Sequence, residues 1–125
     1  MTDNTTHHSD LTRLLLYVKD VPRVAAFYTR YFGYTAKQLP DDRIVEMSPP
    51  GTGVVLMLHQ AAKGQRSGQA QVKLVFDVAD VPGFCQTSEA NGLAFGPIHQ
   101  AAGYCFANAK DPAGNSISIS SRAFV

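Results

Sequence analysis

Two basic residues, Arg13 and Lys73, are the side chains whose positions most directly suggest chemistry. They lie 60 residues apart, and each begins an apolar stretch that leads, seven residues later, to an aspartate, Asp20 or Asp80. If both stretches are strands, alternation places the two cations on matching faces. Such a pair could bind an anionic organic molecule. Equally, each cation could pair with an internal carboxylate such as Asp77.

The chain carries few other residues in a catalytic arrangement. It has no GxSxG nucleophile motif, no GxxxxGK[ST] phosphate loop and no GxGxxG dinucleotide motif. Cys85 falls within a predicted helix and Cys105 lies between two aromatic residues, so both are expected in the core rather than as nucleophiles. With one cysteine in each half and no CxxC motif, the sequence favours a reducing cytoplasm.

The composition is that of an ordinary globular domain. The chain has 125 residues, 45% of them hydrophobic and 17% charged, and its net charge is +1. These values predict one folded domain and give no reason to expect a nucleic-acid or membrane partner. No apolar stretch approaches the roughly 20 residues that span a bilayer, and the polar segment 1–10 reads as a flexible tail rather than a signal peptide.

A repeat organises the chain. The sequence VKDVP at 18–22 returns 60 residues later as VADVP at 78–82. Each copy follows an apolar, strand-like stretch and precedes a helical pattern, expected at 21–32 and 81–91, that ends at a glycine. The repeat predicts two similar modules, over 11–62 and 72–125, joined by a polar linker over 63–71.

Turn-forming residues divide the rest of each module into short strands. In the first module, the strand at 11–19 and the helix are followed by expected strands at 34–39, 43–47 and 54–60. In the second, the strand at 72–78 and the helix are followed by expected strands at 94–100, 104–109 and 116–120. The plan is βαβββ twice, which is an α+β fold.

These features resemble the vicinal oxygen chelate superfamily, which includes glyoxalase I, the bleomycin-resistance proteins, fosfomycin-resistance enzymes and extradiol dioxygenases. The resemblance rests on the two modules, on the VxDxxxxxxFY pattern at 18–28 with Gly33 after it, and on the closing GP, G and DPAGN elements between 96 and 115. It implies a glyoxalase/bleomycin-resistance fold: a cup-shaped, eight-stranded mixed sheet made of two four-stranded sheets, usually completed in a homodimer.

The resemblance also implies where a divalent metal would be held. Metal-dependent members place His, Glu or Gln at four inward strand positions, and the matching residues here are Arg13, Met57, Lys73 and Ser118. Arginine and protonated lysine have no lone pair to donate, methionine sulfur is a poor ligand for these ions, and a serine hydroxyl is a weak one. We therefore expect no metal and no cofactor.

A displaced metal site is the alternative. His59 lies two residues after Met57 and hence on the same strand face, while His99 and Glu46 lie on other expected strands. Two histidines and a carboxylate are suitable ligands for a divalent transition metal. A histidine near a strand end is, however, more often a hydrogen-bonded rim residue.

Three classes of function remain open. The favoured class is a metal-free small-molecule-binding protein similar to the bleomycin-resistance proteins, a homodimer that sequesters an organic molecule, anionic if Arg13 and Lys73 face it. Its candidate ligand-binding residues are Arg13, Tyr17, Met57, Lys73, Tyr104 and Ser118. The second class is a metal-dependent lyase or dioxygenase with displaced ligands. The third is an interaction protein that uses only its surface, and the sequence names no catalytic residue for any of them.

Overall fold

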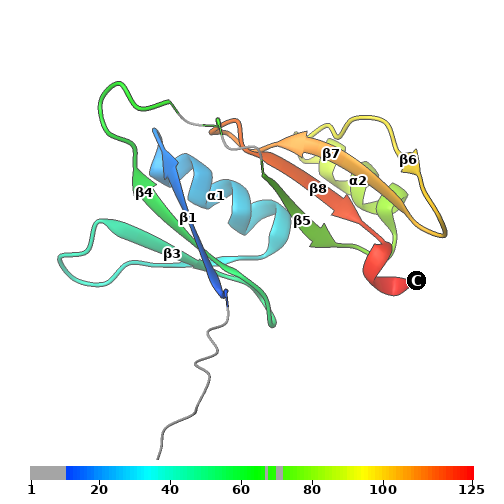
Figure 1. Ribbon diagram of the computed structural model, residues 1–125, viewed down its shortest axis with the longest axis horizontal. Helices are drawn as coiled ribbons and strands as arrows, with labels where there is room; N and C mark the ends of the chain where they lie inside the picture. Colours follow the sequence, from blue (N-terminus) through cyan, green and yellow to red (C-terminus); the bar gives the residue numbers. More distant parts are fainter. Residues whose placement is uncertain (1–10, 67, 70–71) are drawn as a thin grey trace, which may run out of the picture.

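The structure, a computed structural model, describes residues 11–66, 68–69 and 72–125. The expected tail at 1–10 and part of the expected linker lie outside the described residues. Two βαβββ modules follow one another along the chain (Figure 1). This arrangement confirms the α+β fold that the repeat and the turn residues predicted. Among the described residues, no helix is long and apolar enough to cross a membrane.

The elements follow the same order in both modules. The first module contains β1 (Arg13–Val18), α1 (Val21–Phe32), β2 (Thr35–Lys37), β3 (Ile44–Ser48) and β4 (Val55–Gln60). The second contains β5 (Lys73–Asp77), α2 (Val81–Ala90), β6 (His99–Gln100), β7 (Cys105–Lys110) and β8 (Ser116–Ser120), followed by a short 3-10 helix, η1 (Arg122–Phe124).

Local capping explains where the helices begin and end. The Asp20 carboxylate accepts the backbone N–H of Arg23, and the Asp80 carboxylate accepts that of Gly83, so each aspartate satisfies a free donor of the first helical turn. A proline in that first turn costs little, because its missing N–H would have no helical partner. Gly33 ends α1 in the left-handed conformation, with φ of 71°.

The eight strands form two four-stranded sheets, with orders β1-β4-β3-β2 and β5-β8-β7-β6. The first strand of each module pairs in parallel with the last, so β1 and β5 are edge strands. Both helices lie behind the sheets in Figure 1. The opposite faces of the two sheets, here called the open faces, therefore look to the same side of the molecule.

Helix α1 joins the two modules in one core. Its residues Val24, Phe27 and Tyr28 are buried, and the apolar cluster around them extends into β5 and β8 of the second module. The Phe32 ring stacks on Phe76 of β5 at 3.8 Å between centroids. Such aromatic contacts across the module boundary hold the two halves together.

A buried hydrogen bond also joins the modules. The Tyr28 hydroxyl on α1 donates to the Asp111 carboxylate, 2.7 Å away, in the β7–β8 turn. The same carboxylate accepts the backbone N–H groups of Ala113 and Asn115 and the side-chain amide of Asn115. With four donors, this buried carboxylate, 4% exposed, is fully satisfied.

One predicted strand is mostly wrong. The segment 94–100 was expected to be a strand, yet only His99–Gln100 pairs as β6. Pro97 has no N–H to give to a ladder, which accounts for the lack of regular pairing before it. The segment still follows β7, because the Gly96 N–H donates to the Asn108 carbonyl at 2.9 Å.

Replacing Tyr28 by phenylalanine tests the buried bond. Tyr28→Phe is expected to lower the free energy of unfolding by about 2 kcal/mol at neutral pH, because a buried carboxylate loses a donor. Burial and then the Asp111 carboxylate raise the pKa of Tyr28 above its ordinary value of 10.0, so the folded protein keeps this proton where the unfolded chain loses it. The free energy of unfolding of the wild type should therefore fall as the pH rises past 10. Between pH 10 and 11, Tyr28 should account for about 1 kcal/mol of this loss, and the variant should lack that part.

Urea unfolding at pH 7, 10 and 11 measures both effects. Tyr17→Phe is the matched control, because Tyr17 is 46% exposed and its ring packs against His59 within the first module. An alkaline loss of stability that is as large in Tyr28→Phe as in the wild type would contradict the assignment.

Candidate functional site

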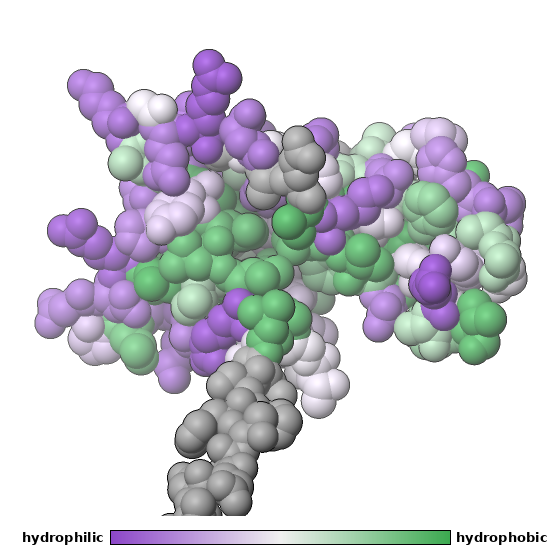
Figure 2. Space-filling model, in the orientation of Figure 1, coloured by the Kyte–Doolittle hydropathy of each residue, from purple (hydrophilic) through white to green (hydrophobic). Residues whose placement is uncertain are grey.

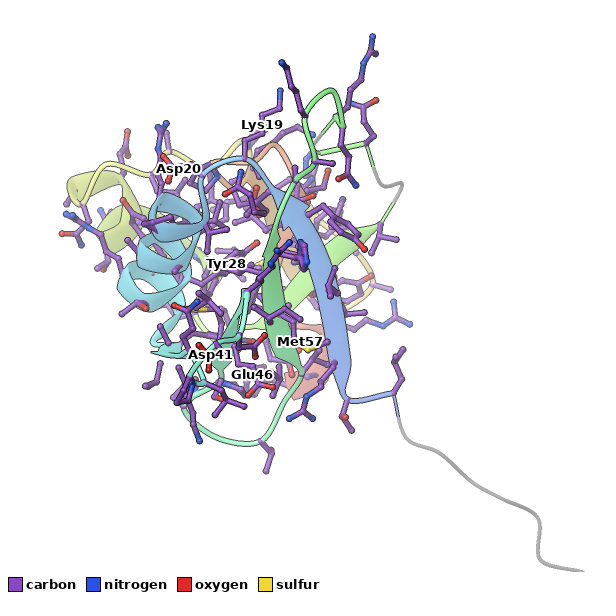
Figure 3. The ribbon with its side chains drawn as sticks, turned by 90° about the vertical axis from the view of Figure 1, so that its left-hand side faces the viewer. Lys19, Asp20, Tyr28, Asp41, Glu46 and Met57 are labelled. Atoms are coloured by element: carbon purple, nitrogen blue, oxygen red, sulfur yellow. The ribbon has the colours of Figure 1, made fainter. Side chains whose placement is uncertain are left out.

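Three of the six candidate ligand-binding residues lie on the open face of the first sheet. Arg13 pairs with Glu46 of β3, with 3.6 Å between Nε and Oε1. Tyr17 packs against His59 at 5.4 Å between ring centroids. Met57 lies in register with Glu46, and Figure 3 labels both on this sheet, with Tyr28 toward the helices on the left of the sheet in that view. Arg13 therefore has an internal carboxylate partner, which is Glu46 rather than Asp77.

The other three candidates belong to the second sheet and its flanks. Lys73 donates to the side-chain oxygen of Asn108 at 3.0 Å. Ser118 is only 2% exposed, and its hydroxyl donates to the Ala107 carbonyl. The Tyr104 hydroxyl accepts a hydrogen bond from Arg122. In the described part of the chain, Lys73 has no carboxylate within ion-pair distance.

The structure does not bring the six residues together within one chain. Arg13, Tyr17 and Met57 stand on one sheet, and Lys73, Ser118 and Tyr104 stand on or beside the other, with no contact recorded between the two groups in the described residues. Within one chain, the two cations therefore belong to different sheets and have different partners, Glu46 for Arg13 and Asn108 for Lys73.

The residues at the metal positions do not fit a metal. Arg13 and Lys73 are cations engaged with Glu46 and Asn108, and Ser118 is buried with its hydroxyl already donated. The displaced alternative is not assembled either, because His99 stacks on Phe106 of the second sheet while His59 lies on the first. Throughout the described ranges, no group of three His, Cys, Asp or Glu side chains could hold a metal ion.

A cavity of about 620 Å³ lies between the modules, next to the edge strand β5. The β3–β4 loop at 49–54 forms one side of it, and Leu14 and Leu56 of the first sheet form another. Five aromatic side chains contribute to its wall: Tyr31, Phe32, Tyr34, Phe76 and Phe84. This volume lies within the range of sites that enclose small organic ligands.

Few polar groups reach this cavity. The Tyr34 hydroxyl donates to the Val54 carbonyl at 3.3 Å, and burial raises the pKa of Tyr34, so its phenol stays neutral near pH 7. Lys73 and Asp77 of β5 supply its charged groups. An apolar, aromatic wall with a few polar groups is suited to holding an organic molecule by contact and stacking.

Sequence reasoning missed most of this wall. None of the five aromatic residues is among the six candidates predicted from the sequence, and Tyr31, Phe32 and Tyr34 also pack in or against the core. A stronger signal was available in segment 27–34, FYTRYFGY, where five of eight residues are aromatic. One helix stripe cannot bury so many rings against its own sheet, and the excess faces the second module.

The chain belongs to the Glyoxalase/Bleomycin resistance protein/Dioxygenase superfamily, whose family model matches residues 10–119. No curated protein matches the sequence significantly. The fold is shared with solved structures over nearly their whole length. One is TnmS3, described as an antibiotic binding protein from Streptomyces sp. CB03234, with a TM-score of 0.75 and 20% identity over 92% of this chain and 97% of that one.

Other similar structures carry different descriptions. The integron cassette protein VCH_CASS1, from the mobile metagenome of V. cholerae, has a TM-score of 0.70 and 25% identity over 93% of this chain and 97% of that one. Lactoylglutathione lyase from Agrobacterium tumefaciens has a TM-score of 0.69 and 22% identity over 92% and 95%. TnmS3, described as a binding protein, and a lyase thus share this fold, so the function has to be inferred from the residues of the site.

The side chains at the four metal positions predict that this protein binds no divalent ion. Protein purified without chelator is expected to contain no stoichiometric divalent ion by mass spectrometry. Titration with Ni²⁺, Zn²⁺, Mn²⁺ or Fe²⁺ is expected to leave its melting temperature unchanged, because an ion that bound the native state would raise it. Stabilisation by one ion that disappears in His59→Ala or Glu46→Gln would establish the displaced site instead.

Proposed function

We propose that this protein binds a small organic molecule without a metal ion, and that a homodimer forms the complete site. The observation that carries the proposal is the aromatic cavity beside β5, in a fold whose four metal positions hold unsuitable side chains. The described antibiotic-binding activity of TnmS3, a structural neighbour, supports the same class of function.

The cavity favours binding over catalysis. Its titratable lining residues in the described chain are Lys73, Asp77, Tyr31 and Tyr34. Burial keeps the Tyr34 phenol protonated, so it cannot serve as a base at neutral pH. Cys85 lies in the second module's core, and burial raises the pKa of its thiol, which disfavours a nucleophilic role. Aromatic contacts, with Lys73 near one wall, suit a flat molecule that carries an anionic group.

The open faces support the homodimer. Figure 2 shows apolar surface over both sheets on this side of the molecule. Val72 and Val75, beside the unpaired edge of β5, are 59% and 58% exposed. Exposed apolar side chains next to an unpaired strand edge favour contact with another protein chain. Because β1 is the matching bare edge of the first module, a second copy could place its first sheet alongside β5.

That arrangement would also unite the candidate residues. The first sheet of the second copy would bring its Arg13, Tyr17 and Met57 toward Lys73 and the open face of the second sheet. The two groups that one chain keeps apart would then border one site. A reciprocal contact of this kind closes as a twofold dimer, the commonest symmetry of small oligomers.

Ligand binding can be followed with a single introduced fluorophore. The chain contains no tryptophan, so Thr52→Trp places one indole on the β3–β4 loop at the cavity. We expect flat aromatic carboxylates from a small panel to change its fluorescence saturably. Lys73→Met should weaken carboxylates about tenfold while leaving neutral analogues unchanged, because it removes only the charge partner.

Thr87→Trp is the control, since Thr87 lies exposed on α2 and does not line the cavity. A panel that changes both reporters equally, or neither of them, would overturn the cavity assignment. Isothermal calorimetry on the wild type gives the stoichiometry independently of the reporter.

The dimer is tested by mass in solution. The wild type should sediment at twice its chain mass of 13.5 kDa. Val75→Asp should shift it toward the monomer, because a carboxylate would be buried in an apolar contact. Leu39→Asp is the matched control: Leu39 is also apolar and 50% exposed, but it lies in the β2–β3 turn away from β5. A wild type that sediments as a monomer at all concentrations would refute the homodimer.

A further inference from the structure

A second concave region lies on the other side of α1. It is a groove of about 450 Å³ between α1, the turn after α2 and the β7–β8 turn. Three cations line it: Arg23 and Arg30 from α1, and Lys110 from the end of β7. Here it is called the basic groove.

The arrangement of α1 sets the spacing of two of these cations. Arg23 and Arg30 are seven residues apart, which is two helical turns, so they stand on one face of the helix. Lys110 approaches from the second module, across the groove. Ala26, Leu93 and Pro112 supply apolar surface between the charges.

In the described residues these three cations form no ion pair, and the nearby Asp20 carboxylate bonds the backbone N–H of Arg23. The one ion pair recorded in the described residues is Arg13–Glu46, on a different face. Asp111 also lines the groove, but its carboxylate is buried and engaged with four donors. Lys110 bonds only a neutral hydroxyl, that of Ser116 at 3.3 Å, and Arg30 lies over the Tyr31 ring at 5.8 Å.

The walls of the groove are fixed relative to one another. The Tyr31 hydroxyl donates to the Asn91 carbonyl at 2.6 Å, which ties α1 to the turn after α2. The Tyr28–Asp111 bond ties α1 to the β7–β8 turn. The backbone elements that carry the three cations are therefore already held in place before a ligand binds, which lowers the entropic cost of binding.

We propose that the basic groove binds a small multivalent anion, with phosphate or carboxylate groups held by Arg23, Arg30 and Lys110. Guanidinium groups bind the oxygens of either group through paired N–H donors, and the apolar surface between them accepts a compact organic body. The groove is distinct from the aromatic cavity, where Lys73 is the cation, although Tyr31 borders both. The proposal does not depend on the ligand of the cavity.

The experiment uses pyrophosphate, citrate and phenyl phosphate as probes, with sodium chloride at matched ionic strength as the reference. Binding to the wild-type protein is followed by the amide chemical shifts of Ala26, Gly92 and Leu93, which line the groove. We expect saturable shifts at these amides with at least one probe and none with chloride. Stronger binding of pyrophosphate or of citrate identifies the preferred anionic group. Inorganic phosphate is a fourth probe, and tighter binding of phenyl phosphate than of inorganic phosphate shows use of the apolar surface.

Paired variants separate a site from general charge attraction. Arg23→Ala with Arg30→Ala should weaken binding at least tenfold. Lys37→Ala with Arg43→Ala removes the same net charge from exposed positions outside the groove and should change it less than twofold. Equal weakening in both pairs, the same shifts with chloride, or shifts confined to β5 would overturn the proposal. Melting temperatures of both pairs confirm that the variants are folded.

Discussion

The buried hydrogen bond between Tyr28 and Asp111 is the constraint on which the rest of the structure depends. It joins the helix of the first module to a turn of the second across 83 residues of sequence. A buried carboxylate is costly unless it has enough hydrogen-bond donors, and Asp111 gains its fourth donor, the Tyr28 hydroxyl, only when α1 lies against the β7–β8 turn. Shifting the modules relative to each other would leave this charge short of a donor. The bond therefore fixes the module junction more specifically than apolar packing alone.

Fixing α1 at the junction creates both concave regions. One side of the helix carries Phe32 toward β5 and, with Tyr34 just after the helix, forms part of the aromatic cavity. Another side carries Arg23 and Arg30 and forms the basic groove. Tyr31, between them, lines both. A single helix, half in its own module and half against its neighbour, thus separates two regions of opposite chemical character, one apolar and one cationic.

Local chemistry could be predicted from the sequence, and long-range contacts could not. The expected helix at 21–32 agrees with α1 at both ends, because Asp20 and Gly33 determine its limits within a few residues. The strand at 116–120 was likewise predicted, because the turn residues at 111–115 fix where it begins. Segment 94–100 is an exception to this contrast, because its partner β7 is close in sequence and the irregular pairing is due to Pro97, which lacks an N–H. Asp111 was placed in its turn, but nothing local reveals a partner on α1. The repeat assigns three candidate residues to each module, but it does not reveal that Arg13 pairs with Glu46 and Lys73 with Asn108.

The two modules have diverged in charge, and this divergence bears on where a ligand would bind. Arg13 and Lys73 occupy equivalent positions of the repeat, yet Arg13 faces the carboxylate of Glu46 and Lys73 faces the neutral amide of Asn108. An anionic group near Arg13 would compete with a carboxylate already in place. Near Lys73 it would meet a cation without such a competitor, on the strand that borders the aromatic cavity. Charge and shape therefore both favour a ligand beside Lys73. If both modules carried the same ion pair, charge would not distinguish the two positions.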